Sequence, residues 1–380
     1  MIYLDYLSTT PCDPAVVAAM LPWFGEDFGN PHSVHGPGRK AAQAVERARE
    51  GVAGLLGVEA REIVFTSGAT EANNLAIKGG ARHLVRLGDP RRRIITVATE
   101  HKCVLESVRA LAAEGFEAVA LGVDSDGRVD PEALREALKV PTLLVSIMAA
   151  NNETGVLQDI PQLAALVKAA GALMHVDLAQ MAGKMPVSLK DVDLASVSAH
   201  KMYGPKGIGA LYVRRRPRVR LAALFSGGGQ ERGFRSGTLP TPLVVGFGVA
   251  AELAVANMAD EAVRLGLLRD DLWVQLQNGL PGIALNGAGA PRLAGALNVC
   301  LPEGLRALDV LEACPDVAAS TGSACTAAEI APSYVLTAMG LSAQKASQCL
   351  RLSVGRSTSK ADIDRAAELL IAAARTCQPN

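Results

Sequence analysis

Apolar residues in this chain fall into two patterns that alternate from about residue 62 to residue 213. Short runs rich in Val, Ile and Leu, typical of strands, are followed by longer segments in which apolar residues recur at helical spacing. Strands that are apolar throughout and separated by helices favour a mostly parallel sheet covered by helices on both faces. The predicted strands are Glu62–Phe65, Arg93–Val97, Ala118–Leu121, Thr142–Ile147, Leu173–Asp177, Asp193–Val197 and Ala210–Val213.

The predicted helices precede and separate these strands. Their expected positions are Pro14–Trp23, Lys40–Leu56, one opening near Thr70, one from about Lys102 to Gly115, Pro131–Leu138 and one ending near Ala170. Beyond residue 213 a long helix is predicted from Thr241 to about Leu280, then strands at Ala296–Cys300, Val317–Ser320 and Arg351–Arg356 and a last helix at Ala361–Ala374. At this length two domains are expected. We assign residues 15–255 to a large domain, and residues 1–14 with 256–380 to a smaller α+β domain.

The composition of the chain argues against some classes of partner and indicates a cellular compartment. Lys and Arg number 38 and so do Asp and Glu, which argues against a nucleic-acid partner. The seven cysteines form no CxxC pair, as expected of free thiols in a reducing compartment. The N-terminus lacks the pattern of a signal peptide, and the apolar run near Leu243–Ala256 is too short to cross a bilayer. A cytoplasmic protein without a membrane partner is predicted.

Two loops in the first part of the chain have candidate chemistry. The segment from Gly29 to Gly38 is rich in Gly and Pro and reads as a surface loop, in which His32 and His35 lack further ligands at metal-binding spacing. The stretch from Thr66 to Asn73 joins a strand to a helix through small residues, which leaves backbone N–H groups available for an anion. An ordinary helix N-cap at Thr66 or Ser67 explains the same residues.

One lysine stands out because of its place between two strands. Lys201 follows the strand Asp193–Val197, and Gly204-Pro205 with Gly207 forces a tight connection to the next strand. A desolvated amine has a lowered pKa and can form a Schiff base with an aldehyde. Lys201 as the Schiff-base amine and Asp177 as the partner of a pyridinium nitrogen are together the minimum set of residues for binding pyridoxal phosphate (PLP). A surface hairpin with solvated lysines is the alternative.

The positions of other polar residues favour a shared site. His101, Asn152, Asp177 and Lys201 all lie at or just after the ends of predicted strands. Ligands of open α/β sheets bind outside the carboxyl ends of the strands. These four residues are therefore expected to meet.

Taken in order, the motifs of the chain resemble those of the cysteine desulfurases, PLP enzymes of fold type I related to class V aminotransferases, in the branch used for housekeeping and nitrogen-fixation iron–sulfur assembly. The matching stretches are Tyr3-Leu4-Asp5, Gly29-Asn30-Pro31, Thr66-Ser67-Gly68-Ala69-Thr70-Glu71, Thr99-Glu100-His101-Lys102, Asn151-Asn152-Glu153, Ser198-Ala199-His200-Lys201, Arg235-Ser236-Gly237-Thr238 and Gly322-Ser323-Ala324-Cys325-Thr326. Such a fold has a mostly parallel seven-stranded sheet in its large, PLP-binding domain, and a smaller domain that carries the catalytic cysteine loop.

The resemblance implies roles for individual residues. Lys201 would carry PLP, Asp177 would pair with its ring nitrogen and His101 would stack on the ring and move protons. The implied cofactor contacts are Ala69, Thr70, Asn152, Gln180, Ser198 and His200, with Thr238 reaching in from a second subunit. Asn152 and Arg351 would bind the substrate carboxylate, and Cys325 would accept the sulfur.

The same resemblance implies a reaction and partners. L-Cysteine would give L-alanine and a persulfide on Cys325, for iron–sulfur cluster assembly and other sulfur transfer. A homodimer, with the active site completed across its interface, and a sulfur-acceptor or iron–sulfur scaffold protein are the expected partners. No resident metal is expected, although Cys325 could contact a nascent iron–sulfur cluster. Ala149 departs from the pattern, because many relatives have histidine there.

Other readings come from different classes of protein. Within the fold they are a selenocysteine lyase, an aminotransferase or a kynureninase-like lyase, and Cys325 argues against the last two. A non-catalytic binding module is disfavoured by the presence of both Lys201 and Asp177. A dinucleotide site at Gly204–Gly209 is disfavoured because no GxGxxG follows a first strand.

Overall fold

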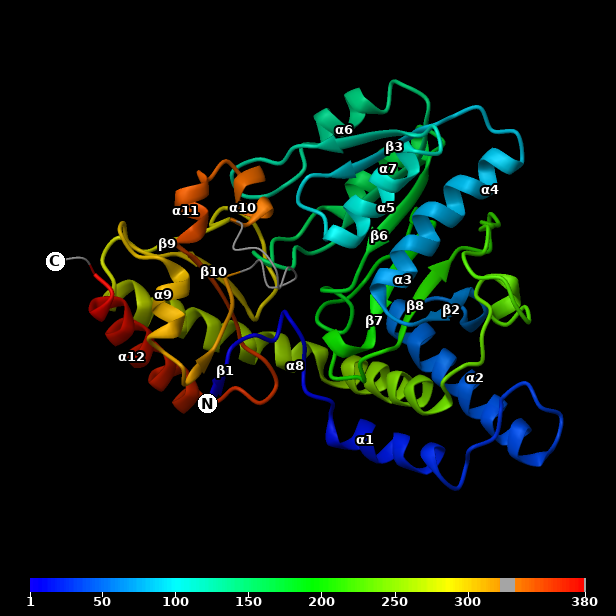
Figure 1. Ribbon diagram of the computed structural model, residues 1–380, viewed down its shortest axis with the longest axis horizontal. Helices are drawn as coiled ribbons and strands as arrows, with labels where there is room; N and C mark the ends of the chain where they lie inside the picture. Colours follow the sequence, from blue (N-terminus) through cyan, green and yellow to red (C-terminus); the bar gives the residue numbers. More distant parts are fainter. Residues whose placement is uncertain (322–331, 379–380) are drawn as a thin grey trace.

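The computed structural model describes residues 1–321 and 332–378 and is built around one large sheet (Figure 1). The sheet has seven strands in the order β2-β8-β7-β6-β5-β3-β4. Its strands are β2 (Ile63–Thr66), β3 (Arg93–Val97), β4 (Glu117–Leu121), β5 (Thr142–Met148), β6 (Leu173–Asp177), β7 (Leu194–Ser198) and β8 (Gly209–Val213). Strand β8 alone runs opposite to the other six strands. The predicted mostly parallel, seven-stranded sheet is thereby confirmed.

Helices cover both faces of this sheet, because neighbouring strand residues point to opposite sides. Ile95 packs into a core with α2, α6, α7 and the first part of α8, whereas Ile94 packs into a second core with α3, α4 and α5. The helices are α1 (Pro14–Met20), α2 (Gly36–Leu56), α3 (Ala69–Asn74), α4 (Gly80–Arg86), α5 (Lys102–Ala112), α6 (Pro131–Ala137), α7 (Ile160–Ala169) and α8 (Thr241–Gly279). A π-helical turn, Leu75–Gly79, joins α3 to α4.

A smaller α+β part is formed by the C-terminal segments together with the N-terminus (Figure 1). Its antiparallel sheet has the order β12-β10-β9, and the N-terminal strand β1 pairs in parallel with β11. Leu4 is fully buried in the core of this part, which ties the first residues to the last helix. The elements are β1 (Ile2–Tyr3), β9 (Ala284–Leu285), β10 (Ala296–Cys300), α9 (Ala307–Glu312), β11 (Val317–Ala318), α10 (Tyr334–Ala338), α11 (Ala343–Ser347), β12 (Cys349–Ser353) and α12 (Lys360–Thr376).

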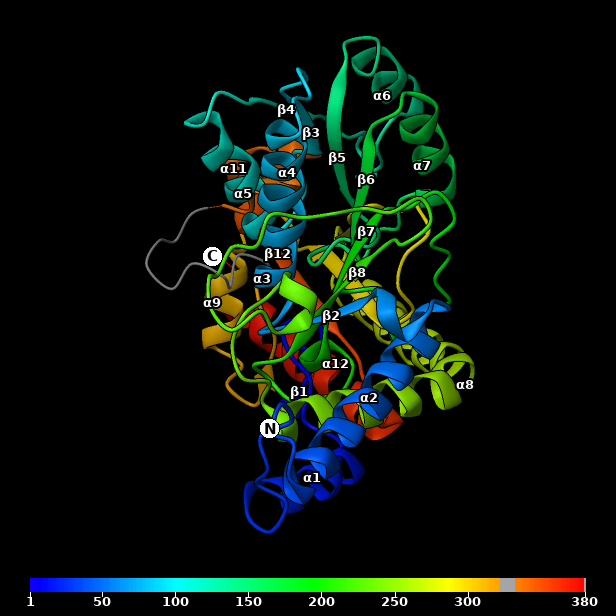
Figure 2. The same cartoon turned by 90° about the vertical axis from the view of Figure 1, so that its right-hand side faces the viewer.

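The long helix α8 extends from beneath the large sheet to the smaller part, as Figures 1 and 2 show. Phe247 at its start packs against the large core, and Leu276 near its end packs into the small one. Among the described residues α8 alone is long and apolar enough to cross a membrane by length and composition, with a mean hydropathy of 1.6 over the tested window. The sequence expectation, which considered only the run near Leu243–Ala256, underestimated this stretch. The predicted domain boundary after residue 255 falls inside α8 and stays a prediction.

Local predictions for α2, β12 and α3 were wrong, and α1, α5 and β11 end two or three residues before their predicted ends. Helix α2 begins at Gly36 instead of Lys40, because Pro37 occupies its first turn, where no N–H is needed, and His35 caps it. Strand β12 ends at Ser353 instead of Arg356. Gly68, and neither Thr66 nor Ser67, is the N-cap of α3, with no side-chain cap hydrogen bond.

Candidate active site

A cavity of about 470 Å3 lies at the carboxyl ends of the parallel strands. This volume falls in the range of about 300–1,000 Å3 found for small-molecule sites. Its lining includes most of the predicted site residues, namely Ala69, Thr70, His101, Asn152, Asp177, Gln180, Ser198, His200 and Lys201. The structure therefore brings together residues that are up to 132 positions apart between Ala69 and Lys201 in the chain. Thr238 and Arg351 do not line it, and Cys325 lies outside the described residues.

Asp177 ends β6 and is held rigidly at the wall of the cavity. Its Oδ2 accepts a hydrogen bond of 2.7 Å from Asn73 Nδ2, and its Oδ1 accepts one of 2.8 Å from the Ala179 amide. The side chain is almost fully buried, so these donors replace water as stabilisers of the carboxylate. A fixed, desolvated carboxylate of this kind is suited to hold a cationic N–H group of a ligand.

Lys201 lies in the short 3-10 turn Ala199–Lys201 that follows β7. Its Nζ donates 2.6 Å hydrogen bonds to the carbonyl oxygens of Leu7 and Ser8. The turn is held against the N-terminal segment as well, since the Thr10 amide and hydroxyl both donate to the His200 carbonyl. The N-terminal segment thus positions the amine at the cavity, a contact that strand patterns alone could not reveal.

His101 caps α5 and lies beside a thiol. Its Nδ1 is 3.0 Å from Cys103 Sγ and accepts from the Cys103 amide at 3.2 Å. The preceding residue, Glu100, is fully buried and accepts a hydrogen bond from the Met148 amide. Burial, and then the neighbouring Asp177 carboxylate, raise the pKa of Glu100 well above its usual value. Burial therefore favours the protonated, neutral form of Glu100 beside the histidine.

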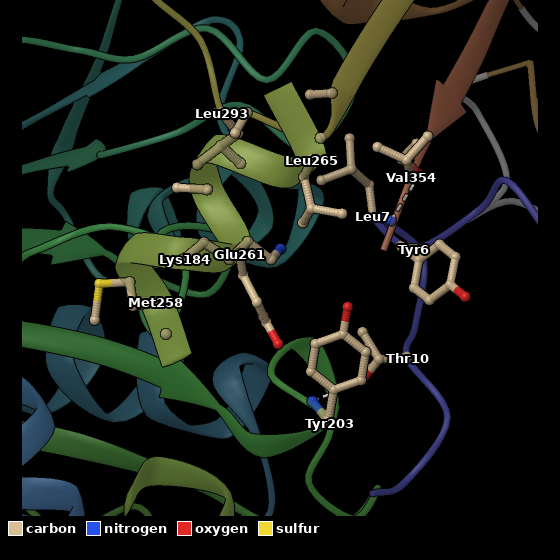
Figure 3. Close-up of a pocket in the computed structure, with 16 residues that line it drawn as sticks. Tyr6, Leu7, Thr10, Lys184, Tyr203, Met258, Glu261, Leu265, Leu293 and Val354 are labelled. Atoms are coloured by element: carbon tan, nitrogen blue, oxygen red, sulfur yellow. Dashed lines mark hydrogen bonds between the residues drawn. The ribbon is translucent and has the colours of Figure 1, made fainter. Parts of the chain in front are cut away.

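Gln180 is fixed from both ends of its amide. Its Nε2 donates 2.8 Å to the Leu7 carbonyl, and its Oε1 accepts 3.0 Å from Lys184 Nζ. Figure 3 shows Lys184 at a second, smaller cavity of about 40 Å3, whose lining also includes Tyr203 and Glu261. Burial, then the charge of Lys201 and of Arg351, lower the pKa of Lys184 to about 7. Lys184 was not among the predicted site residues, although its position four residues after Gln180 was a usable signal.

The loop before α3 forms one end of the cavity. Gly68 has φ of 152°, a conformation that requires glycine, and Gly209 must also lack a side chain because a Cβ there would lie 2.7 Å from Gly68 Cα. His200, which lines the same cavity, has its Nδ1 3.0 Å from the Thr9 hydroxyl. Burial, then nearby Lys201 and Lys206, lower the pKa of His200 to about 4. His200 is therefore neutral at pH 7.

The guanidinium of Arg351 is already paired within the protein, and Arg351 does not line the cavity. Its Nη2 forms an ion pair of 2.8 Å with Asp5 Oδ1, and its Nη1 donates 3.0 Å to the Asn152 carbonyl. Its side chain is only 4% exposed, and within the described residues its Nε has no hydrogen-bond partner. The predicted role in carboxylate binding stays a prediction, and the pairing with Asp5 was not foreseen.

The remaining predicted site residues have separate outcomes. Thr238 is exposed on this chain, and its predicted contact across a subunit interface stays a prediction. Ala149, the departure noted in the sequence, is 1% exposed and packs in the core of the large sheet.

The residues present fit PLP. The lining of the cavity includes the amine-bearing Lys201, a rigid carboxylate at Asp177 and the polar loop of residues 67–70, which match the aldehyde, ring nitrogen and phosphate of this cofactor. Asn152 lines the cavity, and its buried Oδ1 has no hydrogen-bond partner within residues 1–321 and 332–378. A buried polar atom without a partner is costly, so a bound polar ligand would complete the site.

Comparisons with known proteins agree with this chemistry. The model of the class-V aminotransferases matches residues 2–366. A cysteine desulfurase IscS of Anaeromyxobacter sp. strain Fw109-5 is 52% identical over 97% of this chain and 91% of its own length, and one of Rickettsia akari is 48% identical over 97% and 90%.

Solved structures give the same result. A NifS-like protein superposes with a TM-score of 0.89 at 37% identity, over 98% of each chain. A NifS-like protein of Rickettsia africae superposes with a TM-score of 0.87 at 30% identity, over 98% of this chain and 99% of its own. The chain belongs to the class-V aminotransferase family and, within it, to the PLP-dependent cysteine desulfurases.

Proposed function

We propose that this protein takes the sulfur from L-cysteine, leaving L-alanine, with Lys201 as the PLP-bearing lysine and Cys325 as the thiol that receives the sulfur. The observation that carries the proposal is the meeting of Lys201, Asp177 and His101 at one cavity. When bound, PLP supplies an electron sink that stabilises negative charge on the substrate Cα.

Asp177, Lys201 and His101 each have a separate role in handling protons. Asp177, fixed by Asn73 and the Ala179 amide, keeps a proton on the ring nitrogen of the cofactor. Lys201 Nζ takes the proton from the substrate Cα, guided by the carbonyl groups that orient it. His101, neighbouring the same cavity, serves as a second proton carrier.

Sulfur transfer needs a thiolate, and we assign it to Cys325. Its sulfur attacks the substrate Sγ, the substrate Cβ–S bond breaks and Cβ takes up a proton, which leaves alanine and an enzyme persulfide. Arg351, with Asn152, is assigned to the substrate carboxylate, because planar guanidinium donors match carboxylate oxygens.

The wider assignments rest on the family. We propose a cytoplasmic homodimer in which Thr238 of one subunit reaches the phosphate end of the other cavity, and transfer of the persulfide sulfur to an iron–sulfur scaffold or another acceptor. The large domain is assigned to residues 15–255, and the small one to residues 1–14 and 256–380. Exposure of Thr238 on the isolated chain supports the dimer.

One assay tests the proposed activity. Purified protein with PLP and a thiol reductant is given L-cysteine, and alanine and sulfide are measured over time. The two products are expected in equal amounts, and neither is expected without PLP or from Lys201→Ala. Formation of a keto acid in place of alanine would indicate an aminotransferase. Release of selenide from selenocysteine with no turnover of cysteine would indicate a selenocysteine lyase.

A further inference from the structure

Two cysteines that the proposed reaction does not use lie opposite each other on β10 and β12. Cys300 is the cross-strand partner of Cys349 in this antiparallel pair. The Leu301 amide donates to the Gln348 carbonyl at 3.0 Å, so the adjacent pair, Cys300 with Cys349, is of the non-hydrogen-bonded kind. Such pairs have Cα atoms about 4.5 Å apart, within the span of about 4.4–6.8 Å that disulfides bridge.

Both sulfur atoms lie near the same backbone carbonyl group. Cys349 Sγ lies 3.2 Å from the Lys345 carbonyl oxygen, and Cys300 Sγ lies 3.7 Å from the same atom. Side chains opposite each other on an antiparallel ladder share one face of the sheet. A bond between the two sulfurs therefore requires side-chain rotation and no shift of the strands.

The two thiols differ in accessibility and acidity. Cys300 is half-buried, whereas Cys349 is fully buried. The hydrogen bond from Cys349, together with the nearby Lys345 ammonium, lowers the pKa of Cys300 to about 7, and the same pairing together with burial raises the pKa of Cys349. A thiol whose pKa is lowered thus lies beside one whose pKa is raised, the arrangement of an attacking and a resolving cysteine.

We propose that Cys300 and Cys349 form a dithiol that closes to a disulfide when it meets hydrogen peroxide. The Cys300 thiolate sulfur attacks one peroxide oxygen and the O–O bond breaks. Hydroxide departs as the leaving group, and Cys300 becomes a sulfenic acid. The Cys349 sulfur then attacks the Cys300 sulfur, forms the S–S bond and expels the hydroxyl group, which leaves as water with the Cys349 proton. Peroxide is reduced to water by the two electrons that the thiols lose.

The dithiol is coupled to the proposed carboxylate site. Asn286 Nδ2 donates both to Cys349 Sγ at 3.2 Å and to Asn298 Oδ1 at 2.7 Å. Asn298 is the strand partner of Arg351, two residues along the same face from the cysteine pair. Closing the disulfide changes the acceptor of Asn286, so we expect the KM for L-cysteine to rise. This second expectation, unlike the disulfide itself, rests on the proposed function of Arg351.

Peptide mapping tests the disulfide without reference to activity. The PLP-loaded full-length protein is freed of reductant, treated with hydrogen peroxide, alkylated and digested with trypsin. Cleavage after Arg292, Arg306, Lys345 and Arg351 puts Cys300 and Cys349 in different peptides, and Cys325 in a third. A Cys300–Cys349 cross-linked peptide that dithiothreitol reverses is expected. Separate peptides, sulfinic acid on Cys300, or linkage of Cys300 to any other cysteine would overturn the proposal.

Matched variants sharpen the result. Cys349→Ser should leave the sulfenic acid of Cys300 unresolved, so that dimedone labels it, while Cys300→Ser should leave Cys349 reduced. Cys314→Ser, at a buried cysteine elsewhere in the small core, should cross-link like the wild type. Peroxide should raise the KM of the wild type by about fivefold, the equivalent of one lost hydrogen bond, and leave that of Cys300→Ser unchanged. An equal KM before and after cross-linking would overturn the coupling to Arg351.

Discussion

Arg351→Ala removes the guanidinium that we assign to the substrate carboxylate. Removing one partner of a buried charge pair costs about 2–5 kcal/mol, and about 1.4 kcal/mol corresponds to tenfold in affinity. Arg351 is 4% exposed and its Nε has no partner among the described residues, so a carboxylate there would meet an oriented, dry donor. The apparent KM for L-cysteine should therefore rise by at least about tenfold.

This substitution also disturbs the fold, and the assay must separate the two effects. Asp5 and the Asn152 carbonyl lose their donor, which should lower the free energy of unfolding by about 1–3 kcal/mol. Cysteamine, which is cysteine without the α-carboxylate, serves as the comparison substrate. A structural defect weakens turnover of both compounds, whereas loss of the carboxylate contact weakens only that of cysteine.

The ratio of kcat/KM for cysteine to that for cysteamine is the decisive quantity. It should fall by at least about tenfold in Arg351→Ala. Asp5→Asn is the matched control, because it breaks the same ion pair and keeps the guanidinium, so the ratio should stay high. An unchanged ratio in Arg351→Ala, or an equal fall in Asp5→Asn, would refute the assignment.

Three further predictions concern the cavity and its surroundings. Lys201→Ala should lose the absorbance of lysine-bound PLP and retain non-covalent PLP through Asp177, and a lysine-bound spectrum in this variant would contradict the assignment. The pKa of Glu100 is raised in the folded state, so the folded protein binds more protons than the unfolded one, and the free energy of unfolding falls as pH rises above about 4.5. Glu100→Gln should remove this dependence of stability on pH, which is at most about 1.4 kcal/mol per pH unit. Denaturant unfolding followed from pH 5 to 8 measures it. An unchanged slope would mean that Glu100 is ionised. Lys184→Met removes a cation that contacts Gln180 and should raise the pH at which bound PLP changes its absorbance, while an unchanged titration would exclude that coupling.

The sheet and the position of the site were predictable because both follow from local patterns. The strand Arg93–Val97 was predicted with its observed bounds, since a continuous apolar run between helices is typical of a buried parallel strand. Asp177 and Lys201 were placed together because the carboxyl ends of parallel strands share one edge. The roles of Lys201 and Asp177 toward PLP followed from the chemistry of their side chains, whereas the roles of the other site residues were assigned only through the resemblance to a known family.

Contacts between distant segments could not be predicted from the sequence. The ion pair of Asp5 with Arg351 joins residues 346 positions apart, and the carbonyl groups that hold Lys201 belong to an N-terminal segment without regular structure. The start of α2 was misplaced because Gly36 and Pro37 favour loops and helix starts alike. Pairing of Cys300 with Cys349 depends on strand register, which the apolar pattern did not determine.

The most direct test of the central claim is mass spectrometry of the wild-type protein after brief exposure to L-cysteine. After alkylation and trypsin digestion, one added sulfur atom is expected on Cys325, and fragment spectra distinguish it from Cys314, which lies on the same peptide. The adduct should disappear with dithiothreitol and be absent from Lys201→Ala. An added sulfur on a different cysteine, or alanine formation with no added sulfur on the protein, would contradict the account.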